Sequence, residues 1–358
     1  MKTSLAKRCL KGREDMKRKW SIATIFKSTE AYIAITILAV SFLIQLVSGQ
    51  FYTANNLVDN VRSFVPSALF SIGLMVVLIS GGIDLSFPAV GALSSYIVIG
   101  WQNAWGGEGS LVVGYALVML LGAIMGAVNG ILIAHFKFQP MIVTLATSNI
   151  FRGILQGALR CHELFLPEKL LDFGRGSLFE VSNAELGIKA SMPLTVLFVI
   201  VLALITYFIL QRTMVGRGIF AIGGDIQAAS RAGFPVFGIQ MFVYIFAGAT
   251  AAFSGYTRFI MNLYCVPTSL IGTETTIIAG VVLGGVRMTG GVGTIAGAFL
   301  GTMLLTIVSN SLLLLNIPTY WQTLITAIFI IVGTGITGIQ ILVARHKAAT
   351  VRLEDGKA

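Results

Sequence analysis

Charged residues are scarce in this chain. Asp, Glu, Lys and Arg make up 11% of its 358 residues, whereas hydrophobic residues make up 56% and the mean hydropathy is +0.86. A soluble domain carries about 25% charged residues, which it needs to cover its surface with water-compatible groups. The scarcity excludes an ordinary soluble domain and predicts an all-α polytopic membrane protein.

Cysteine and histidine are also rare and scattered. There are three of each, so no spacing suggests a metal site or a disulfide framework. The topology below would allow a disulfide between Cys161 and Cys265, which nothing in their spacing favours. The phosphate-binding pattern GxxxxGK[ST] and nucleophile-elbow patterns are absent. We therefore expect no enzyme, no metal and no cofactor bound by this chain.

Positive charge is concentrated at one end. The net charge is +10, and eight of the 25 lysines and arginines fall between Lys2 and Lys19. Such a basic tail beside a membrane span acts as an orientation signal and contacts anionic lipids, so we expect no nucleic-acid partner. We interpret 1–30 and 344–358 as basic cytoplasmic tails. Since no small-residue cleavage site follows the first span, we expect it to remain as an anchor.

The long apolar runs predict about ten transmembrane helices, because a helix needs about 20 residues to cross about 30 Å of hydrocarbon. They form a transmembrane domain over 31–343. The predicted spans are 31–48, 64–80, 88–101, 111–134, 140–156, 192–210, 239–256, 270–286, 294–315 and 320–343.

Charge distribution supports an even number of spans. With ten, both termini are cytoplasmic, and so are the basic residues Lys137, Arg212, Arg217, Arg231 and Arg287. The acidic loop 158–191 then lies outside, and the loop 212–238 lies in the cytoplasm. Nine spans would move the C-terminal arginines outside.

The loop 212–238 is a polar island between apolar runs. Asp225 precedes an alanine-rich turn that Gly233 and Pro235 close, which predicts a capped helix of about two turns over 225–232. It is either an ordinary connector or a helix stabilised by a partner. The candidate contact residues are Gly223, Gly224, Asp225, Ala228, Ala229, Arg231 and Gly233.

Two glycine-rich breaks interrupt apolar segments, at 80–88 and at 283–293. Aligning Gly81-Gly82-Ile-Asp-Leu-Ser with Gly284-Gly285-Val-Arg-Met-Thr gives a short internal match, which chance could also produce. Such breaks point towards a transport pathway. Asp84 and Ser86 either line the inner end of the pathway or, for Asp84, cap the following helix.

Other polar residues lie within the predicted spans. Glu274 lies at the start of the eighth predicted span, where the helix dipole stabilises a carboxylate. We favour this structural role for Glu274 over a proton-carrying role. Asn129, Thr144, Asn149 and Asn310 are expected to form interhelical hydrogen bonds, and a few could line a polar route. Small residues at 122–126 and 293–301 suit close helix contact.

Several stretches resemble the ribose-type permeases of ABC importers. They are NNLVDNVRSFVPSALFSIGLMVVLISGGIDLS (55–86), PMIVTLATSNIFRG (140–153), GRGIFAIGGDIQAASRAG (216–233), IAGVVLGGVRMTGGVGTIAGAFLGTMLLTIVSNSLLL (278–314) and YWQ (320–322). The chain departs from the family pattern at Phe87-Pro88, at Asp225, where Asn is frequent, and after Glu274. These departures bear on which sugar is carried.

The resemblance implies a binding-protein-dependent sugar importer of the bacterial inner membrane. Two permease subunits, identical or paralogous, would form the path, and separate ATPase subunits that bind ATP and Mg²⁺ would dock on the 225–232 coupling helix. A periplasmic or lipid-anchored solute-binding protein would deliver substrate to the outer loops. The alternatives are an ABC permease for branched-chain amino acids or nucleosides, and an ion-coupled secondary transporter that uses Asp84 or Glu274.

Overall fold

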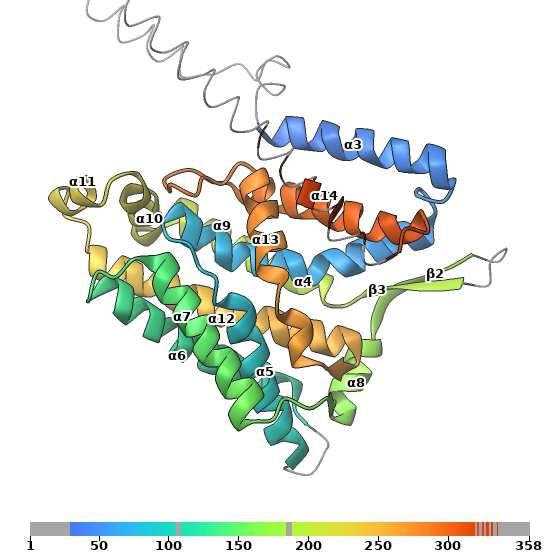
Figure 1. Cartoon of the computed structure of the whole chain (residues 1–358), viewed down its shortest axis with the longest axis horizontal. Coiled ribbons are helices and arrows are strands. Elements are labelled where there is room, and N and C mark those ends of the chain that lie inside the picture. The colour runs from blue at the N-terminus through green and yellow to red at the C-terminus, as the bar shows by residue number, and fades with distance from the viewer. Residues whose placement is uncertain are drawn as a thin grey trace, which may run out of the picture.

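A computed structural model describes residues 29–104, 109–183 and 188–318, and the single positions 321, 324, 325, 327, 328, 331 and 335. The described chain is a mostly helical bundle (Figure 1). Most of the predicted tail 1–30, the tail 344–358 and most of the predicted tenth span lie outside the described residues.

The principal helices follow the apolar runs of the sequence. They are α3 (Thr29–Ser48), α4 (Ala54–Ile79), α5 (Phe87–Ala104), α6 (Leu111–Ala134), α7 (Pro140–Gly153), α9 (Val196–Arg212), α10 (Met214–Gly224), α11 (Ile226–Arg231), α12 (Val236–Asn262), α13 (Thr273–Leu283) and α14 (Ile295–Leu314). The short α8 (Glu168–Arg175), the π-helix η1 (Ile154–Ala158) and the 3₁₀ helix η2 (Pro267–Leu270) complete the helical elements.

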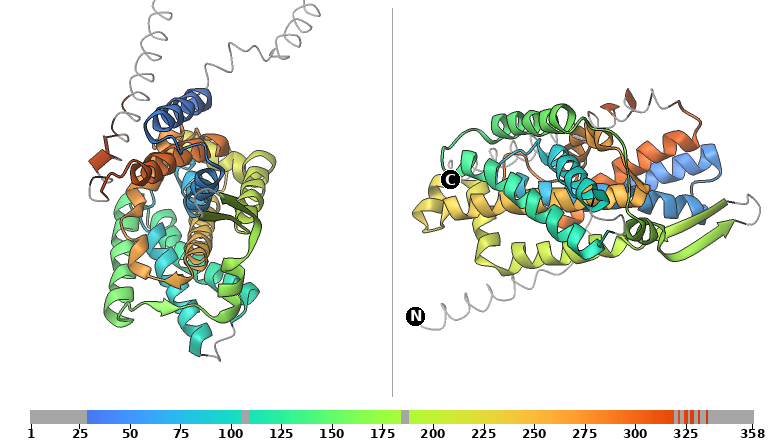
Figure 2. Two further views of the ribbon diagram at one scale, coloured as in Figure 1. Left: turned by 90° about the vertical axis from the view of Figure 1, so that its right-hand side faces the viewer. Right: turned by 90° about the horizontal axis from the view of Figure 1, so that it is seen from below.

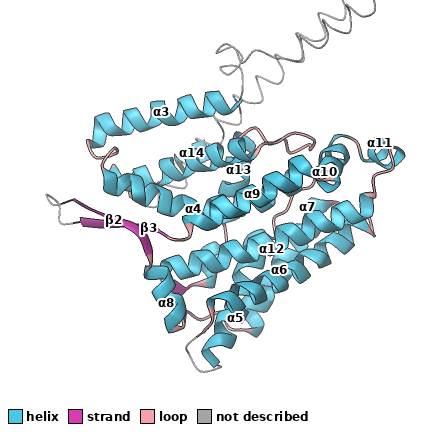
Figure 3. Ribbon diagram, turned by 180° about the vertical axis from the view of Figure 1, so that it is seen from behind, coloured by secondary structure: helices cyan, strands magenta, loops and turns pink. Residues whose placement is uncertain are grey.

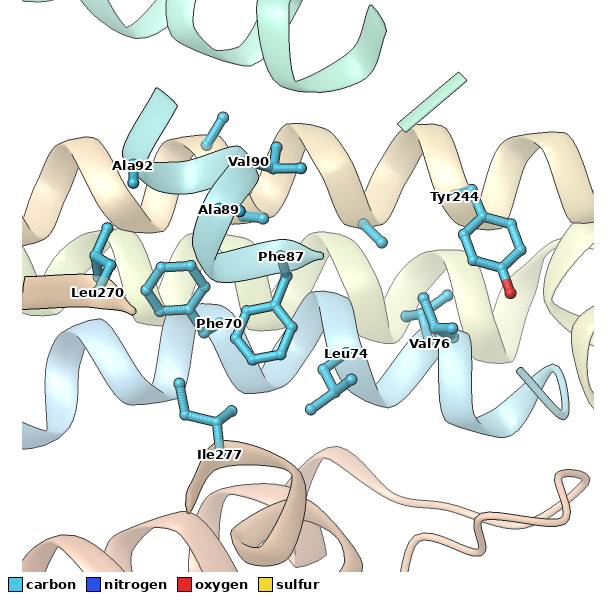
Figure 4. Close-up of a cluster of buried hydrophobic side chains, with 14 of the residues drawn as sticks. Phe70, Leu74, Val76, Phe87, Ala89, Val90, Ala92, Tyr244, Leu270 and Ile277 are labelled. Atoms are coloured by element: carbon cyan, nitrogen blue, oxygen red, sulfur yellow. The ribbon is translucent and has the colours of Figure 1, made fainter. Parts of the chain in front are cut away.

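Helix α4 forms the centre of the bundle. Its C-terminal part is largely apolar, and the whole stretch 68–80 is buried, as expected for a helix enclosed by others. It contacts α12, α14 and α9. The rings of Phe70 in α4 and Phe87 in α5 lie 5.4 Å apart, and Figure 4 shows them beside Leu74. The start of α5 is therefore fixed against the middle of α4.

Helices α6 and α12 pack through small residues. A Cβ atom on Gly122 or Gly126 would overlap the backbone of α12, and one on Gly248 would overlap the backbone of α6. Where no hydrophobic effect drives helices together, such close approach provides the dispersion contacts that hold them. The expectation of close contact at 122–126 is thus confirmed.

The expectation of an all-α chain is wrong in two places. Strands β2 (Ser177–Asn183) and β3 (Ile188–Pro193) form an antiparallel pair that extends from the end of the bundle opposite α11 (Figure 3). Strands β1 (Leu164–Phe165) and β4 (Tyr264–Cys265) form a second, short pair. β-forming residues such as Phe179 and Val181 lie in the predicted outer loop, where strand pairing satisfies their backbone groups. Because β3 extends to Pro193, helix α9 begins later than the predicted start at 192.

The number of spans is confirmed only in part. Among the described residues, five helices (α3, α4, α6, α12 and α14) are long and apolar enough to cross a membrane. The pair α9 and α10, bent by 74°, would make a sixth. Helix α13 has 11 residues, about 16 Å at 1.5 Å per residue, or about half of a hydrocarbon core. Ten spans and cytoplasmic termini stay predictions.

Helix α3 lies at the periphery. It runs along α14 (Figure 2), and its Ile33 packs against Leu304 and Leu305 of that helix. Leu38, Phe42, Leu46 and Val47 are exposed on its other side. This arrangement suits a helix that faces lipid over most of its circumference.

Candidate functional site

Helix α11 begins and ends where the sequence predicts. The Oδ1 atom of Asp225 accepts hydrogen bonds from the backbone N–H groups of Gln227 (2.8 Å) and Ala228 (3.0 Å). At the other end Gly233 adopts φ +87°, and its N–H donates to the carbonyl of Ser230 while that of Phe234 donates to Ala229. This is an N-cap followed by a Schellman C-cap. The predicted start and stop signals are confirmed.

Helix α11 presents almost all of its surface to the outside. Ala229 is its buried residue, and the remaining residues of the helix are exposed. Among them are Ala228, Arg231 and Ile226, whose apolar side chain is 49% exposed. The helix lies at one tip of the bundle (Figure 1). One side is seated on the protein, and the other is available to a partner.

The segment before α11 reaches both helix breaks through backbone contacts. We call the group Gly81, Gly223, Gly290 and Gly291 the glycine junction. A Cβ atom on Gly223 would overlap the carbonyl oxygen of Ile79, which accepts a 2.8 Å hydrogen bond from the N–H of Gly291. A Cβ atom on Gly290 would lie 2.8 Å from the Cα atoms of both Gly223 and Gly81. Three chain segments therefore meet here, with no space for a side chain at Gly223 or Gly290.

The two breaks share one turn geometry. Gly81 and Gly285 have φ +85° and +87°. In each case the N–H of the glycine donates to the carbonyl three residues earlier, and the N–H of the next residue donates to the carbonyl five residues before it. Both helices thus end in a Schellman motif. The sequence match paired Gly81 with Gly284, so its register is wrong by one residue. The corresponding left-handed glycines are Gly81 and Gly285.

A buried polar network fixes the first break. Ser86 donates to Asp84 Oδ1 through its N–H (2.7 Å) and its hydroxyl (2.6 Å), and its Oγ accepts from Asn129 Nδ2 (2.9 Å). Asn129 Oδ1 accepts from Thr147 Oγ1 (2.7 Å). We call these four residues the Asp84 network. Each is at most 3% exposed, so each polar group depends on its neighbours in place of water.

Asp84 has a narrower role than the cap that the sequence suggested. It accepts from the N–H and the hydroxyl of Ser86, which precedes α5, and not from an amide inside α5. Helix α7 holds the same loop through Thr144, whose Oγ1 accepts from the N–H of Leu85 and lies 3.1 Å from the carbonyl oxygen of Ile83. The loop is thus fixed by α6 and α7 together.

Glu274 forms an ion pair that the sequence did not reveal. Its Oε1 atom lies 2.8 Å from Arg152 Nη2, and its Oε2 atom accepts from the N–H of Gly272 (2.9 Å). The pair joins the end of α7 to the start of α13, and its side chains are 23% and 17% exposed. Nothing in the local sequence of Arg152 points to a partner so distant in the chain.

The remaining predicted residues lie elsewhere. Asn149 is on the exposed side of α7, away from the Asp84 network. Asn310 donates to Asn60 of α4 (3.1 Å). Gly284 packs against Gly297 of α14. Asn310 and Gly284 thus fasten α14 to its neighbours.

Sequence reasoning also missed Tyr244. This α12 residue is 2% exposed, and its hydroxyl has no hydrogen-bond partner in the described part of the chain. A Cβ atom on Gly82 would overlap that hydroxyl, and Figure 4 shows the ring beside Val76 near the end of α4. A lone tyrosine in an apolar span gives no sequence signal of such a position.

Known proteins resemble this chain over most of its length. The family described as branched-chain amino acid transport system / permease component matches residues 56–333. The L-arabinose ABC transporter permease protein of Azospirillum brasilense is 31% identical over 82% of this chain and 83% of its own. The ribose import permease protein of Escherichia coli K12 is 29% identical over 84% and 90%, and the fructose import permease protein of Bifidobacterium longum 28% over 86% and 91%.

No solved structure matches the chain. The family match nevertheless covers well over half of it, including the glycine junction, the Asp84 network and α11. This protein therefore belongs to the family of branched-chain amino acid transport system permease components, a family of membrane transport subunits.

Proposed function

We propose that this chain is the permease subunit of an ABC importer that carries a sugar across the bacterial inner membrane. The observation that supports this most is its similarity to permeases named for L-arabinose, ribose and fructose, which extends over more than four fifths of each chain. The substrate class is thus a pentose, a hexose or a related small polar solute.

The coupling mechanism rests on α11. Separate ATPase subunits, which bind ATP and Mg²⁺, would dock on its exposed side. Force on α11 would pass through Gly223 and Gly224 to the glycine junction, where the ends of both broken helices meet. Packed elements with two discrete arrangements can convert such a displacement into a change of access. The Asp84 network would hold the first break rigid, so that it moves as a unit.

Two further partners complete the transporter. A second permease subunit, the same chain or a paralogue, would form the path together with this one. A periplasmic or lipid-anchored solute-binding protein would dock at the end opposite α11, where the β2–β3 hairpin extends. Since that protein selects the substrate, the permease needs only a weakly polar route.

An ABC permease for branched-chain amino acids is the second candidate, because the family description names that substrate class. An ion-coupled carrier has less support. It needs a carboxylate free to exchange its ion, whereas Asp84 is bonded to Ser86 and Glu274 to Arg152.

Uptake by the assembled transporter separates these functions. The complex would be reconstituted into vesicles with its binding protein, and entry of labelled ribose, arabinose, fructose and leucine measured with ATP, and again with an ion gradient and no ATP. We expect ATP-dependent uptake of a sugar. Uptake of leucine alone supports the second candidate, and uptake driven by the gradient without ATP contradicts both.

The coupling role of α11 has its own test. Ala229→Arg would force a long cation into the buried seat of α11, so we expect loss of uptake and of stimulated ATP hydrolysis, with insertion unchanged. Ser182→Ala, at an exposed position of β2, serves as the control and should have little effect. Normal uptake by the Ala229→Arg complex would exclude this role for α11.

A further inference from the structure

A large cavity opens at the α11 end of the bundle. Its volume is about 780 Å³, within the range of about 300–1,000 Å³ typical of small-molecule sites. Residues from the end of α4, the turn between α6 and α7, α11 and the start of α12 line it. The cavity adjoins the proposed coupling contact, since Ile226 and Arg231 of α11 line it, whereas no member of the Asp84 network does.

The charges around the cavity have one sign. Lys137, in the α6–α7 turn, and Arg231, in α11, both line it, and no carboxylate does. Neither cation forms an ion pair within the described residues. The carboxylate next in sequence to the lining, Asp225, is occupied as the cap of α11. In the part of the chain that the structure describes, two cations without a paired carboxylate share one cavity.

Neutral donors add to these charges. The amide side chains of Gln139, Gln227 and Gln240 line the cavity, and so does Tyr244, whose buried hydroxyl lacks a hydrogen-bond partner in the described chain. A buried polar group without a partner is unfavourable, so it marks a place where a ligand or water can bind. The cavity is thus rich in hydrogen-bond donors.

Two helices also begin at the cavity without side-chain caps. Helix α7 starts at Pro140 behind Gln139, helix α12 starts at Val236 behind Pro235, and neither cap residue provides a side-chain hydrogen bond. Gln139, Pro140 and Val236 line the cavity. The N-terminal end of a helix carries about half a positive charge, which favours anions such as phosphate.

Exposed aromatic rings border the cavity. Phe138 and Phe237 line it, and the ring of Phe136 stacks on that of Phe138 with centroids 5.8 Å apart. All three side chains are more than half exposed. Exposed aromatic rings beside a basic pocket between helix ends are typical of a site for an anionic lipid headgroup.

We propose that this cavity binds a phosphate group, carried by an anionic phospholipid of the adjacent leaflet or by a soluble phosphate. The several oxygens and the charge of a phosphate match the two cations, the three amides and the Tyr244 hydroxyl. The sequence places the α11 end in the cytoplasm, so the leaflet would be the inner one. Occupancy would tie α11 to the α6–α7 turn, since one ligand contacts both.

The test compares matched charge removals in the full chain. Lys137→Gln with Arg231→Gln removes both cations from the cavity. Arg212→Gln with Arg217→Gln removes the same charge from exposed positions outside the lining. Each protein is reconstituted with phosphatidylglycerol or phosphatidylcholine, delipidated in detergent and weighed intact by native mass spectrometry. A second arm measures thermal stabilisation by inorganic phosphate, and size-exclusion profiles verify folding.

We expect the unmodified chain and the Arg212/Arg217 control to retain phosphatidylglycerol, and the Lys137/Arg231 variant to bind it at least about tenfold more weakly, since two charge-assisted bonds are lost. If inorganic phosphate instead stabilises the first two proteins and not the third, the site takes a soluble phosphate. Equal binding by both variants, equal retention of phosphatidylcholine, or no binding in either arm would overturn the inference. None of these results depends on uptake, so failure of this inference would not contradict the proposed transport function, which the uptake experiment tests separately.

Discussion

At the scale of single residues, Ser86 is the centre of the Asp84 network. Its hydroxyl donates to Asp84 and accepts from Asn129, so one side chain joins the α4–α5 break to α6, and through Thr147 to α7. In a buried network every group relies on the next, and the loss of one leaves another unsatisfied.

Asparagine substitutions test this network. Asn129→Ala removes the Oδ1 atom that accepts from Thr147 and the Nδ2 group that donates to Ser86, so we expect a loss of about 1–3 kcal/mol in stability. Asn149→Ala, on the exposed side of α7, should change stability by less than about 0.5 kcal/mol. Thermal unfolding of the purified chains measures both. Equal melting temperatures would show that the network contributes nothing.

A charge exchange tests the Arg152–Glu274 pair. Glu274→Gln leaves a partly buried guanidinium without its counter-ion, and we expect it to cost about 2 kcal/mol. The double variant Arg152→Glu with Glu274→Arg should recover part of that loss. Melting temperatures of the single variants Arg152→Glu and Glu274→Arg and of the double variant form the cycle, and strictly additive effects would mean that the two side chains do not interact.

The sequence singled out Asp84, Ser86 and Asn129 but not Thr147, and Glu274 but not Arg152. Asp84 and Glu274 stand out because carboxylates are rare among apolar spans. Arg152 does not, because a basic residue at a span end is ordinary and its partner is 122 residues away. Helix periodicity relates residues three or four apart and carries no information about such distances.

At the scale of elements, the glycine junction links α10 to both broken helices through backbone atoms alone. Side chains can adjust by changing rotamer, whereas backbone segments in contact must move together. This makes the junction the place where a displacement of α11 would reach the ends of α4 and α13.

Two adjacent glycines provide a matched test. Gly223→Ala places a methyl group on the carbonyl of Ile79, whereas a Cβ atom on Gly224 meets nothing within 4 Å. We expect Gly223→Ala to lower uptake per ATP hydrolysed by the reconstituted complex, and Gly224→Ala to leave this ratio unchanged. The ratio separates coupling from a general loss of folded protein. Identical ratios for both variants would contradict a role for the junction.

Apolar runs located most of the helices. The predicted span 111–134 has the same bounds as α6. The predicted bounds of α3 and α14 differ from the observed ones by no more than two residues. The bend between α9 and α10 was not predicted. The stretch from Met214 to Gly224 is too short to cross a membrane, so the sequence pattern indicated a loop there. The cue was Thr213, whose hydroxyl accepts from the N–H of Gly216 as an N-cap.

At the scale of the whole molecule, the cysteines can test the predicted orientation. Cys265 lies in β4 and pairs with Leu164, Cys161 lies just before β1, and Cys9 is in the predicted inner tail. Cys161 is partly exposed and Cys265 buried, and burial raises the pKa of both thiols.

We expect an impermeant maleimide to label Cys161 from outside intact cells. Labelling should be slow at neutral pH and faster as the pH rises, since the thiolate is the reactive form. Cys265 should react only after unfolding, and Cys9 only from the inside. Mass spectrometry of Cys161→Ser and Cys9→Ser chains assigns each adduct. Labelling of Cys9 from outside would contradict the predicted orientation.

The position of α3 has a consequence for biosynthesis. It is the first described helix to leave the ribosome, yet its partner is α14, and Glu30 accepts from Thr294 across 264 residues. At about 5–20 residues per second, α3 waits on the order of tens of seconds for that partner to be translated. During this interval its apolar surface has only lipid or the insertion machinery to contact, so the bundle closes late.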